Sequence, residues 1–233
     1  MMPVGERVVM ISGASRVIGA AIARRLGAAG YRMSLGVRNP SRSAIEPSDS
    51  CLVTHYDAHE RDAGRAWVAA TMDRFARVDA LVNNAGIARM SAIEDESEDA
   101  LDELWLVNVK APLRVIRAAL PHLRASGAGR IVNVASLSGK RVRNANSGYA
   151  MTKFALVALT HSVRRLGWEH GIRATALCPG FVATDLSAGA KGIDHAEMIQ
   201  PDDLAELVAC LLALPNNTTI AELLVNMRYE DML

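Results

Sequence analysis

The sequence predicts an α/β fold, a doubly wound and mostly parallel sheet with helices on both faces. Short apolar runs alternate with longer segments of helical period along the chain. Such alternation is typical of parallel strands joined by crossover helices. No linker, internal repeat or low-complexity tract divides the sequence, so we expect one domain over residues 1–233.

Seven apolar runs are the expected strands. They are short and mostly apolar, as is usual for strands buried between two layers of helices. The runs cover residues 8–11, 33–37, 51–55, 80–82, 131–134, 174–177 and 223–225.

The segments between these runs have apolar residues three and four positions apart, which predicts amphipathic helices. A stripe that begins at Ile18 defines the first helix, and Gly30 stands where this helix should end. Pro112 and Pro121 are expected to kink or end the longest helical segment, residues 96–124. The other helical segments are expected at residues 61–77, 149–170 and 201–214.

Composition limits the classes of function. Apolar residues make up 50% of the chain and charged residues 22%, with a net charge of +1, which is typical of a globular protein without a nucleic-acid or membrane-surface role. Cys51, Cys178 and Cys210 are too widely spaced to suggest a disulfide framework. No uncharged apolar stretch reaches about 18 residues, and no signal segment is apparent. We expect a cytoplasmic protein.

The histidines do not suggest a metal site. His55 and His59 are four residues apart but straddle the end of an expected strand, and no cysteine is near enough to complete a zinc site. No G-x-S-x-G sequence supports a serine hydrolase. We therefore expect neither a bound metal nor a nucleophilic serine.

The turn after the first strand has the composition of a phosphate-binding loop. Residues 12–19 read Ser-Gly-Ala-Ser-Arg-Val-Ile-Gly, with Gly13 and Gly19 flanking the turn. At this place in a parallel sheet, unpaired N–H groups and the helix dipole favour a pyrophosphate. A plain strand-to-helix turn is the alternative for the glycine pattern alone.

Tyr149 and Lys153 lie four residues apart at the start of a helical segment. This spacing places both side chains on one helix face. A free tyrosine has a pKa of about 10, and a neighbouring ammonium group would stabilise the phenolate and lower that pKa. The other tyrosines have no lysine four residues on. A structural pair on the helix surface remains the alternative.

Ser136 follows the fifth expected strand and precedes Tyr149 by thirteen residues. A hydroxyl at the carboxyl end of a strand can donate a hydrogen bond to the substrate oxygen that the phenol also reaches. Ser138 is the nearby competitor for this role, and a serine that only caps the turn is the alternative.

The ordered set of motifs resembles the short-chain dehydrogenase/reductase (SDR) family, from about residue 7 to about residue 225. The first turn is similar to T-G-x-x-x-G-x-G, with Ser12 in place of threonine and Val17 in place of the middle glycine. Further matches are Asn-Asn-Ala-Gly at residues 83–86, Ser136 with Tyr-x-x-x-Lys, and Pro-Gly-x-x-x-Thr at residues 179–184. The resemblance implies a Rossmann-type fold.

The resemblance also implies the roles of individual residues. Tyr149 would be the acid/base, assisted by Lys153, Ser136 and Asn108, the last holding a water that links the lysine to solvent. Asp57 would contact adenine. The residues expected to bind the dinucleotide are Gly13, Ser15, Arg16, Ile18, Gly19, Arg38, Asp57, Ala58, Asn84, Ala85, Gly86, Tyr149, Lys153, Pro179, Gly180, Val182 and Thr184.

The expected cofactor is NADP(H). An acidic residue after the second strand would select NAD by binding the ribose 2′-hydroxyl, but this strand is followed by Arg38 and Asn39. Arg16 and Arg38 suit a 2′-phosphate, which a guanidinium can bind with two parallel hydrogen bonds. Two solvated surface arginines are the alternative.

We therefore expect an NADP(H)-dependent oxidoreductase acting on a carbonyl or secondary alcohol. The rival hypothesis is a non-catalytic SDR-fold protein that senses a dinucleotide or binds a partner, with Val17 having impaired turnover. Basic residues around 139–144, together with Arg89, favour an anionic substrate if they line the cleft. A solvated basic loop is the alternative.

Two further expectations concern assembly and access to the site. Residues 187–200, with Gly189 and Gly192, resemble a flexible lid in which Met198 and Ile199 form a partly apolar wall. The resemblance also implies a homodimer or homotetramer formed through the helical segments 96–124 and 149–170.

Overall fold

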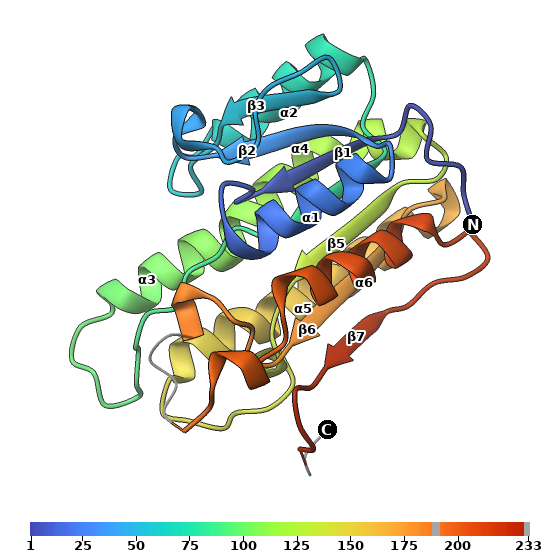
Figure 1. The fold of residues 1–233 in the computed structure, drawn as a ribbon. Coiled ribbons are helices and arrows are strands. Elements are labelled where there is room, and N and C mark those ends of the chain that lie inside the picture. Colours follow the sequence, from blue (N-terminus) through green and yellow to red (C-terminus); the bar gives the residue numbers. More distant parts are fainter. Residues whose placement is uncertain (188–191, 231–233) are drawn as a thin grey trace.

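The computed structural model describes residues 1–187 and 192–230. They form a seven-stranded sheet in the order β3-β2-β1-β4-β5-β6-β7, and every neighbouring pair of strands is parallel (Figure 1). The predicted doubly wound sheet is thus confirmed. The strands are β1 (Val8–Ser12), β2 (Arg32–Val37), β3 (Cys51–His55), β4 (Ala80–Asn83), β5 (Arg130–Val134), β6 (Arg173–Pro179) and β7 (Glu222–Val225).

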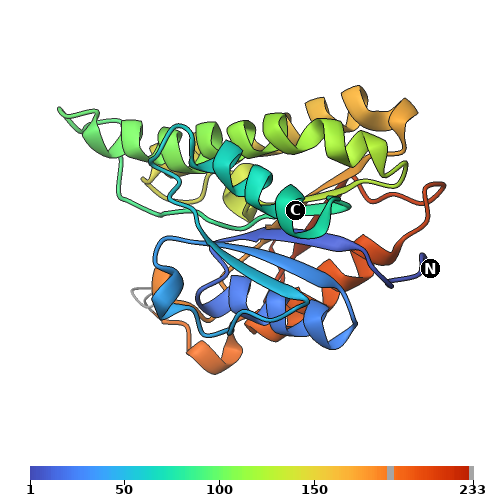
Figure 2. The same ribbon diagram turned by 90° about the horizontal axis from the view of Figure 1, so that it is seen from above.

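Helices cover both faces of the sheet (Figure 2). One face carries α1 (Val17–Ala28) and α6 (Pro201–Ala213). The other face carries α2 (Ala63–Phe75), α4 (Ala111–Ala125) and α5 (Ser147–Gly167), with α3 (Asp99–Trp105) at the end of this layer. This arrangement buries the strands from both sides, which explains why their sequences are mostly apolar.

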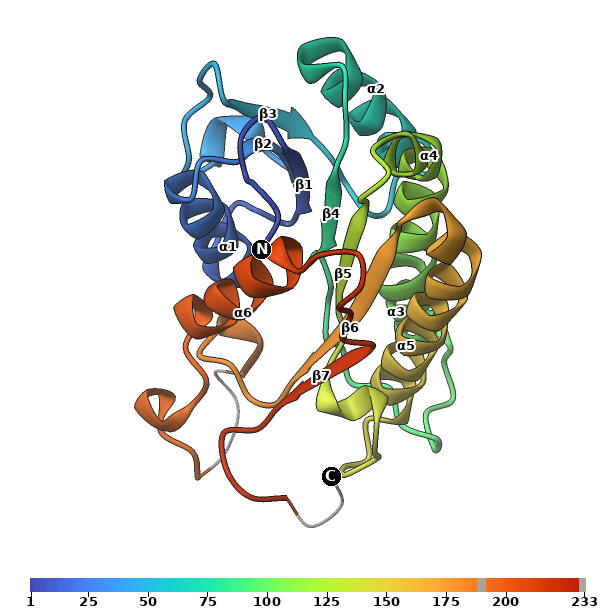
Figure 3. The same ribbon diagram turned by 90° about the vertical axis from the view of Figure 1, so that its right-hand side faces the viewer.

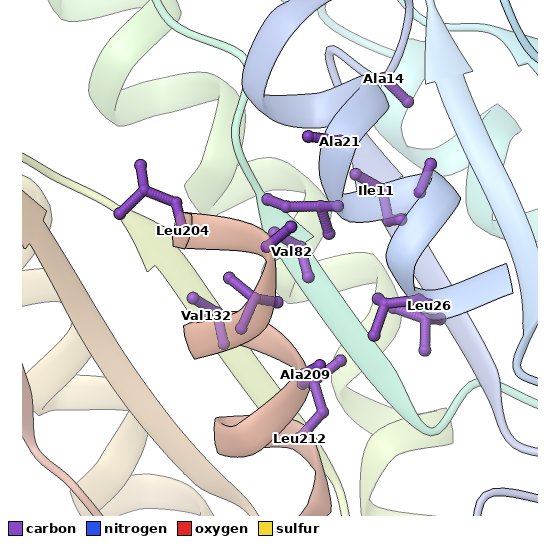
Figure 4. Packing of buried hydrophobic residues seen from close by; sticks show 14 of the residues in the cluster. Ile11, Ala14, Ala21, Leu26, Val82, Val132, Leu204, Ala209 and Leu212 are labelled. Atoms are coloured by element: carbon purple, nitrogen blue, oxygen red, sulfur yellow. The ribbon is translucent and has the colours of Figure 1, made fainter. Parts of the chain in front are cut away.

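The core between α1, α6 and the sheet is built from small and branched side chains. Figure 4 shows strand residues that meet residues of both helices across this interface. The residues are fully or almost fully buried, and they include Ile11, Ala21, Leu26, Val82, Val132, Leu204 and Leu212. Their packing fixes both helices on the sheet and so positions the amino end of α1 beside the end of β1.

The strand order reverses between β1 and β4. In open parallel sheets, ligands bind in the crevice outside the carboxyl ends of the strands at such a switch point. The turns after β1 and β4 therefore mark the expected place for a cofactor.

The predicted helix over residues 96–124 is instead three helical pieces. A π-helical turn, Leu106–Lys110, lies between α3 and α4. Neither proline ends the run: Pro112 lies in the first turn of α4, where a missing N–H costs nothing, and α4 continues through Pro121 to Ala125. The interruption is one widened turn in the backbone.

The predicted lid is only partly described. Gly189 lies outside the described residues. The expectation that Met198 and Ile199 form a wall of the substrate site is wrong, because both are buried and Ile199 pairs with Val182 in an isolated parallel bridge. Ile199 packs into the core between α1, α6 and the sheet, and neither residue lines the cavity described below.

Buried arginines hold the opposite, amino edge of the sheet. Arg130 donates hydrogen bonds to the carbonyl of Leu214 (2.6 Å) and to Oδ1 of Asn216 (3.0 Å). Arg7 donates to the carbonyls of Leu212 and Ala128. Burial, and then the neighbouring positive charges of Arg7 and Arg173, lower the pKa of Arg130 to about 10.

Among the described residues, no helix is both long enough and apolar enough to cross a bilayer.

Candidate active site

A cavity of about 480 Å³ lies at the carboxyl edge of the sheet. Its walls come from the turns after β1, β2, β3, β4, β5 and β6 and from the start of α5. All the residues expected to bind the dinucleotide line this cavity, as do Ser136, Tyr149 and Lys153. The fold thus brings together side chains that are more than 160 residues apart along the chain, from Gly13 to Thr184.

The turn after β1 is compact and needs its two glycines. Gly13 has a φ of 66°, in the left-handed region that favours glycine. A Cβ on Gly19 would lie 2.2 Å from the carbonyl oxygen of Gly13, so no side chain fits there. The glycines allow the backbone to come close to a ligand at the start of α1.

The Asn-Asn-Ala-Gly segment after β4 fixes this turn. The hydroxyl of Ser12 accepts hydrogen bonds from the backbone N–H groups of Asn84 and Ala85, each at 3.0 Å. The side-chain amide of Asn84 donates to the carbonyls of Ser12 (3.0 Å) and Gly13 (3.2 Å). Two neighbouring strand ends are thereby connected at the switch point.

Val17 has a φ of 46°, in the left-handed region. A left-handed backbone is usual for glycine, the residue that Val17 replaces in the motif. A β-branched side chain in this conformation costs of order 1–3 kcal/mol. The strained residue lies in the cavity wall, in the turn that would face a pyrophosphate.

The turn and the start of α1 fit a pyrophosphate. Within the described residues, no side chain caps the first turn of α1, and that turn has no acidic residue. Its N–H groups and the positive end of the helix dipole are therefore available to an anion. A Cβ on Gly13 would also crowd Ala85 at 3.0 Å, so the cradle depends on the absence of side chains.

Two arginines lie at the rim of the cavity. Arg16 forms an ion pair with Asp185 at 2.5 Å, and both side chains are exposed. The Arg38 side chain is exposed, while its carbonyl accepts a hydrogen bond from the ring of His55 at 2.9 Å. Asp185, which the sequence pattern does not place near Arg16, competes with any phosphate for this guanidinium.

Asp57 is part of a small charged network. Burial would raise the pKa of this carboxyl, but hydrogen bonds from the backbone and ring of His59 outweigh burial and lower the pKa below its ordinary value. The His59 ring lies 2.8 Å from Asp57 and 3.2 Å from Glu103. The pKa of His59 is raised, chiefly by the hydrogen bond with Asp57. His59 lines the cavity, although the sequence argument gave it no role.

Tyr149 and Lys153 lie one turn apart on α5, facing the cavity. The Asn146 side chain caps this helix by accepting a hydrogen bond from the N–H of Tyr149 at 3.4 Å. Lys153 Nζ lies 5.5 Å from the centre of the Tyr149 ring and donates to the carbonyl of Val134 at 3.1 Å. Burial lowers the pKa of Lys153 to about 8.

The phenol of Tyr149 has a raised pKa. Burial is the main cause, and a hydrogen bond with Ser136 opposes it in part. The neighbouring lysine does not give the protein alone the lowered pKa that the sequence argument expected, because burial dominates. Near neutral pH the group is a neutral phenol, the form that can donate a proton.

Asn108 lies behind the cavity wall, in the π-helical turn. Its side-chain oxygen accepts from the N–H of Ile87 (3.0 Å), and its nitrogen donates to the carbonyl of Ile87 (3.0 Å) and to Thr152 (3.2 Å). The structure thus does not bring Asn108 to the cavity surface. A Cβ on Gly86 would lie 3.2 Å from Asn108 Oδ1 and 3.7 Å from Lys153 Nζ, so Gly86 lets the two side chains approach each other.

The basic residues expected near the cleft fall into two groups, of which only one lines the cavity. Arg141 and Arg143 line the cavity and pair with Glu230. Lys140 pairs with Glu222 at 2.6 Å, Arg89 pairs with Glu103, and neither of these basic residues lines the cavity. Glu230 was missed because only the folded chain brings it to this loop.

Across residues 1–187 and 192–230, no group of His, Cys, Asp and Glu is arranged to hold a metal ion.

Comparisons with known proteins agree with this geometry. The chain is 44% identical over 217 residues to an agropine synthesis reductase of Rhizobium rhizogenes, covering 91% of this chain and 50% of that protein. The chain therefore spans about half the length of this relative. An uncharacterized oxidoreductase of Staphylococcus epidermidis is 30% identical, over 97% of this chain and 99% of its own length.

Solved structures of similar fold carry nicotinamide dinucleotides. An alcohol dehydrogenase from the archaeon Thermococcus sibiricus, complexed with 5-hydroxy-NADP, has a TM-score of 0.85 and 30% identity, over 96% of this chain and 97% of its own. A 3-ketoacyl-(acyl-carrier-protein) reductase from Brucella melitensis, complexed with NADH, has a TM-score of 0.87 and 29% identity, over 96% and 98%. The family model for short chain dehydrogenase matches residues 7–192, so this chain belongs to the short-chain dehydrogenase family of oxidoreductases.

Proposed function

We propose that the protein is an NADP(H)-dependent oxidoreductase that interconverts a carbonyl and a secondary alcohol, with Tyr149 as the acid/base. One observation carries the proposal: Tyr149, Lys153 and Ser136 converge on the cavity whose other walls are the glycine turn and the Asn-Asn-Ala-Gly segment. The similarity to a reductase and to an alcohol dehydrogenase supports it.

The three side chains divide the work of moving a proton. Ser136 donates a hydrogen bond to the substrate oxygen and orients it toward Tyr149. In the reductive direction the neutral phenol of Tyr149 donates its proton to that oxygen, and the ammonium group of Lys153 stabilises the phenolate that forms. When bound, NADP(H) supplies or accepts the hydride.

Asn108 acts at a distance in this proposal. Its amide holds Ile87 and Thr152, and Thr152 is the residue before Lys153 on α5. We assign Asn108 a positioning role, because its side chain does not reach the cavity surface. Its expected water link to Lys153 stays a prediction.

The preference for NADP(H) rests on charge at the cavity rim. Arg16 and Arg38 are exposed there, and β2 is followed by no acidic side chain that would accept a hydrogen bond from a ribose hydroxyl. A 2′-phosphate would compete with Asp185 for Arg16. The Thermococcus sibiricus alcohol dehydrogenase was solved with 5-hydroxy-NADP, which supports this choice.

Tyr149→Phe tests the proton-transfer role. With NADPH and a panel of aldehydes and ketones, NADPH oxidation followed at 340 nm should fall by at least about a hundredfold, because phenylalanine cannot donate a proton. NADPH binding, measured by fluorescence, should change little. Tyr31→Phe is a suitable control, since Tyr31 is buried in the core and does not line the cavity. Turnover by Tyr149→Phe at the wild-type rate would remove Tyr149 from the mechanism.

The strained Val17 favours a second candidate, a non-catalytic protein that senses a dinucleotide or binds a partner. Replacing Val17 by glycine frees the backbone and opens the turn, so Val17→Gly should bind NADPH several-fold more tightly than wild type. Val17→Ala separates the loss of bulk from the gain in backbone freedom, because alanine remains strained at this φ. No NADPH binding by either wild type or Val17→Gly would favour the partner-binding form of the second candidate over the oxidoreductase.

We also propose that copies of the chain assemble into a homodimer or homotetramer through the helices at residues 99–125 and 147–167. The outer face of α5 leaves Met151 and Phe154 about half exposed, at 51% and 43%. Sedimentation velocity would measure the assembly state, and a monomer at micromolar concentration would contradict this proposal.

A further inference from the structure

Two arginines of the loop before α5 share the cavity with the proton-transfer residues. Arg141 and Arg143 follow Ser136 by only five and seven residues, and all three line the same cavity as Tyr149. A group bound between the arginines therefore belongs to the same ligand-binding space as the candidate reaction centre.

The two arginines already hold a carboxylate. Oε2 of Glu230 accepts hydrogen bonds from Nε (2.8 Å) and Nη2 (2.5 Å) of Arg141, and Oε1 lies 3.1 Å from Nη1 of Arg143. Both carboxylate oxygens are therefore engaged by guanidinium groups, one by Arg141 and the other by Arg143, in charge-assisted contacts.

This cluster differs from the surface ion pairs of the protein. The side chains of Arg141 and Glu230 are 8% and 9% exposed, whereas those of Arg25 and Glu206, which also form an ion pair, are 36% and 63% exposed. Two arginines and one glutamate leave one positive charge in excess, with Arg141 and Glu230 buried and Arg143 about half exposed. Such an excess of positive charge favours the binding of a second anion, or of one anion with a greater negative charge.

Glu230 is held on a weakly anchored segment. Figure 3 shows the chain after β7 leaving the edge of the sheet as a loop, and the described part of it, up to Glu230, contains no helix or strand. Arg228 and Tyr229 are exposed, the latter 88%, so the residues directly before Glu230 bury little that would hold them in place. Displacement of the Glu230 carboxylate by a ligand carboxylate would therefore break the ion pairs with the arginines and few other contacts.

We propose that Arg141 and Arg143 form a binding site for a carboxylate of the substrate, and that Glu230 occupies this site until that carboxylate displaces it. This inference rests on the proposed oxidoreductase function and names its substrate class as oxo acids and hydroxy acids. Glu230 thereby competes with the substrate for the arginines, and this competition lowers the apparent affinity for the substrate.

Binding of glutarate tests the site without turnover. Isothermal titration calorimetry at pH 7 and low ionic strength, with dimethyl glutarate as the uncharged comparison, should show saturable binding of glutarate only. Glu230→Gln should bind glutarate about tenfold more tightly and Arg141→Gln about tenfold more weakly, a change of about 1.4 kcal/mol each. Removal of a merely structural partner would not tighten binding, so the gain with Glu230→Gln is the decisive sign.

Matched controls come from the exposed pair on α1 and α6. Glu206→Gln and Arg25→Gln change the net charge equally but lie outside the cavity, so they should leave glutarate binding unchanged. Arg141→Gln leaves Glu230 buried with one partner and can destabilise the fold. The double variant Arg141→Gln/Glu230→Gln removes both charges, and a thermal melt of each variant verifies folding.

A second measurement separates this inference from the oxidoreductase proposal. Turnover with NADPH of 4-oxopentanoate should exceed that of its methyl ester, and Arg141→Gln should remove this preference while the ester is still reduced. Equal turnover of acid and ester, or glutarate binding that Glu230→Gln does not strengthen, overturns the carboxylate site and leaves the oxidoreductase standing. Glutarate binding without any carbonyl reduction overturns the substrate assignment.

Discussion

The buried ammonium group of Lys153 lowers the stability of the fold, but in the proposed mechanism it stabilises the phenolate of Tyr149. Burial lowers its pKa from 10.5 to about 8. Below about pH 8 both the folded and the unfolded protein carry the proton, and the buried ammonium group destabilises the fold. Between about pH 8 and 10.5 the unfolded chain still holds the proton that the folded protein has released, so this residue makes stability rise with pH in that window.

The same pKa predicts the pH dependence of reduction. kcat/KM for a carbonyl substrate with NADPH should fall as the pH rises through about 8, because a neutral amine no longer stabilises the phenolate that forms at Tyr149. Lys153→Arg keeps its charge above this range, so this limb should disappear while the overall rate is lower. A pH–rate profile measures both effects. The same fall near pH 8 in Lys153→Met would assign it to another group.

At the residue scale, sequence spacing predicts contacts within an element but not contacts made by the folded chain. Tyr149 and Lys153 share a helix face because of the helical repeat, so their proximity could be predicted. Arg141 and Glu230 are 89 residues apart, and their ion pair depends on the path of the chain after β7. The pKa of Tyr149 was misjudged for a related reason, since burial depends on every element that surrounds the ring.

At the element scale, the start of α1 is more sensitive to side chains than its end. Gly19→Ala places a Cβ 2.2 Å from the carbonyl oxygen of Gly13, and because a Cβ cannot rotate away and the carbonyl is part of the backbone, the turn must shift. The expected loss in the free energy of unfolding is about 1–3 kcal/mol. NADPH binding should be abolished, because the pyrophosphate turn is displaced.

Gly27→Ala is the control in the same helix. Its Cβ would lie 2.9 Å from Cε of Met33, the flexible end of a side chain that can move aside. Alanine also favours the helix, so chemical denaturation should show a change within about 1 kcal/mol of wild type. Similar losses of stability for both variants would mean that the turn is less rigid than its geometry implies.

The strands were predictable because each is a short apolar run between turn residues. The structure agrees with the predicted runs and lengthens several of them, most of all β6, which extends from Arg173 to Pro179. The π-helical turn Leu106–Lys110 was not predictable, since one additional residue in a turn changes the apolar spacing too little to detect.

At the scale of the whole molecule, stability and chemistry lie at opposite edges of the sheet. Arg130 is buried at the amino edge, with the positive charges of Arg7 and Arg173 nearby. Its guanidinium satisfies the carbonyls of Gly129 and Leu214 and the side chain of Asn216. These bonds connect β5 to the segment after α6.

Arg130→Met should therefore lower the free energy of unfolding by about 2–4 kcal/mol, because several buried acceptors lose their donor. NADPH affinity at a temperature where the variant is folded should equal that of wild type, since the cavity lies at the other edge. Equilibrium unfolding in urea and NADPH fluorescence measure the two quantities. A large loss of affinity in the folded variant would show that the two edges are coupled.

The packing of α1 on α6 has a consequence for biosynthesis. The apolar face of α1 packs on the sheet and is fully covered once residues 201–213 arrive, and the backbone N–H of Met2 donates to the carbonyl of Ala213. Ribosomes add about 5–20 residues per second, so the nascent chain exposes this face for roughly ten to forty seconds. During that interval, chaperones that recognise exposed apolar helices have their best opportunity to bind, and a translational pause before α6 would prolong the risk of aggregation.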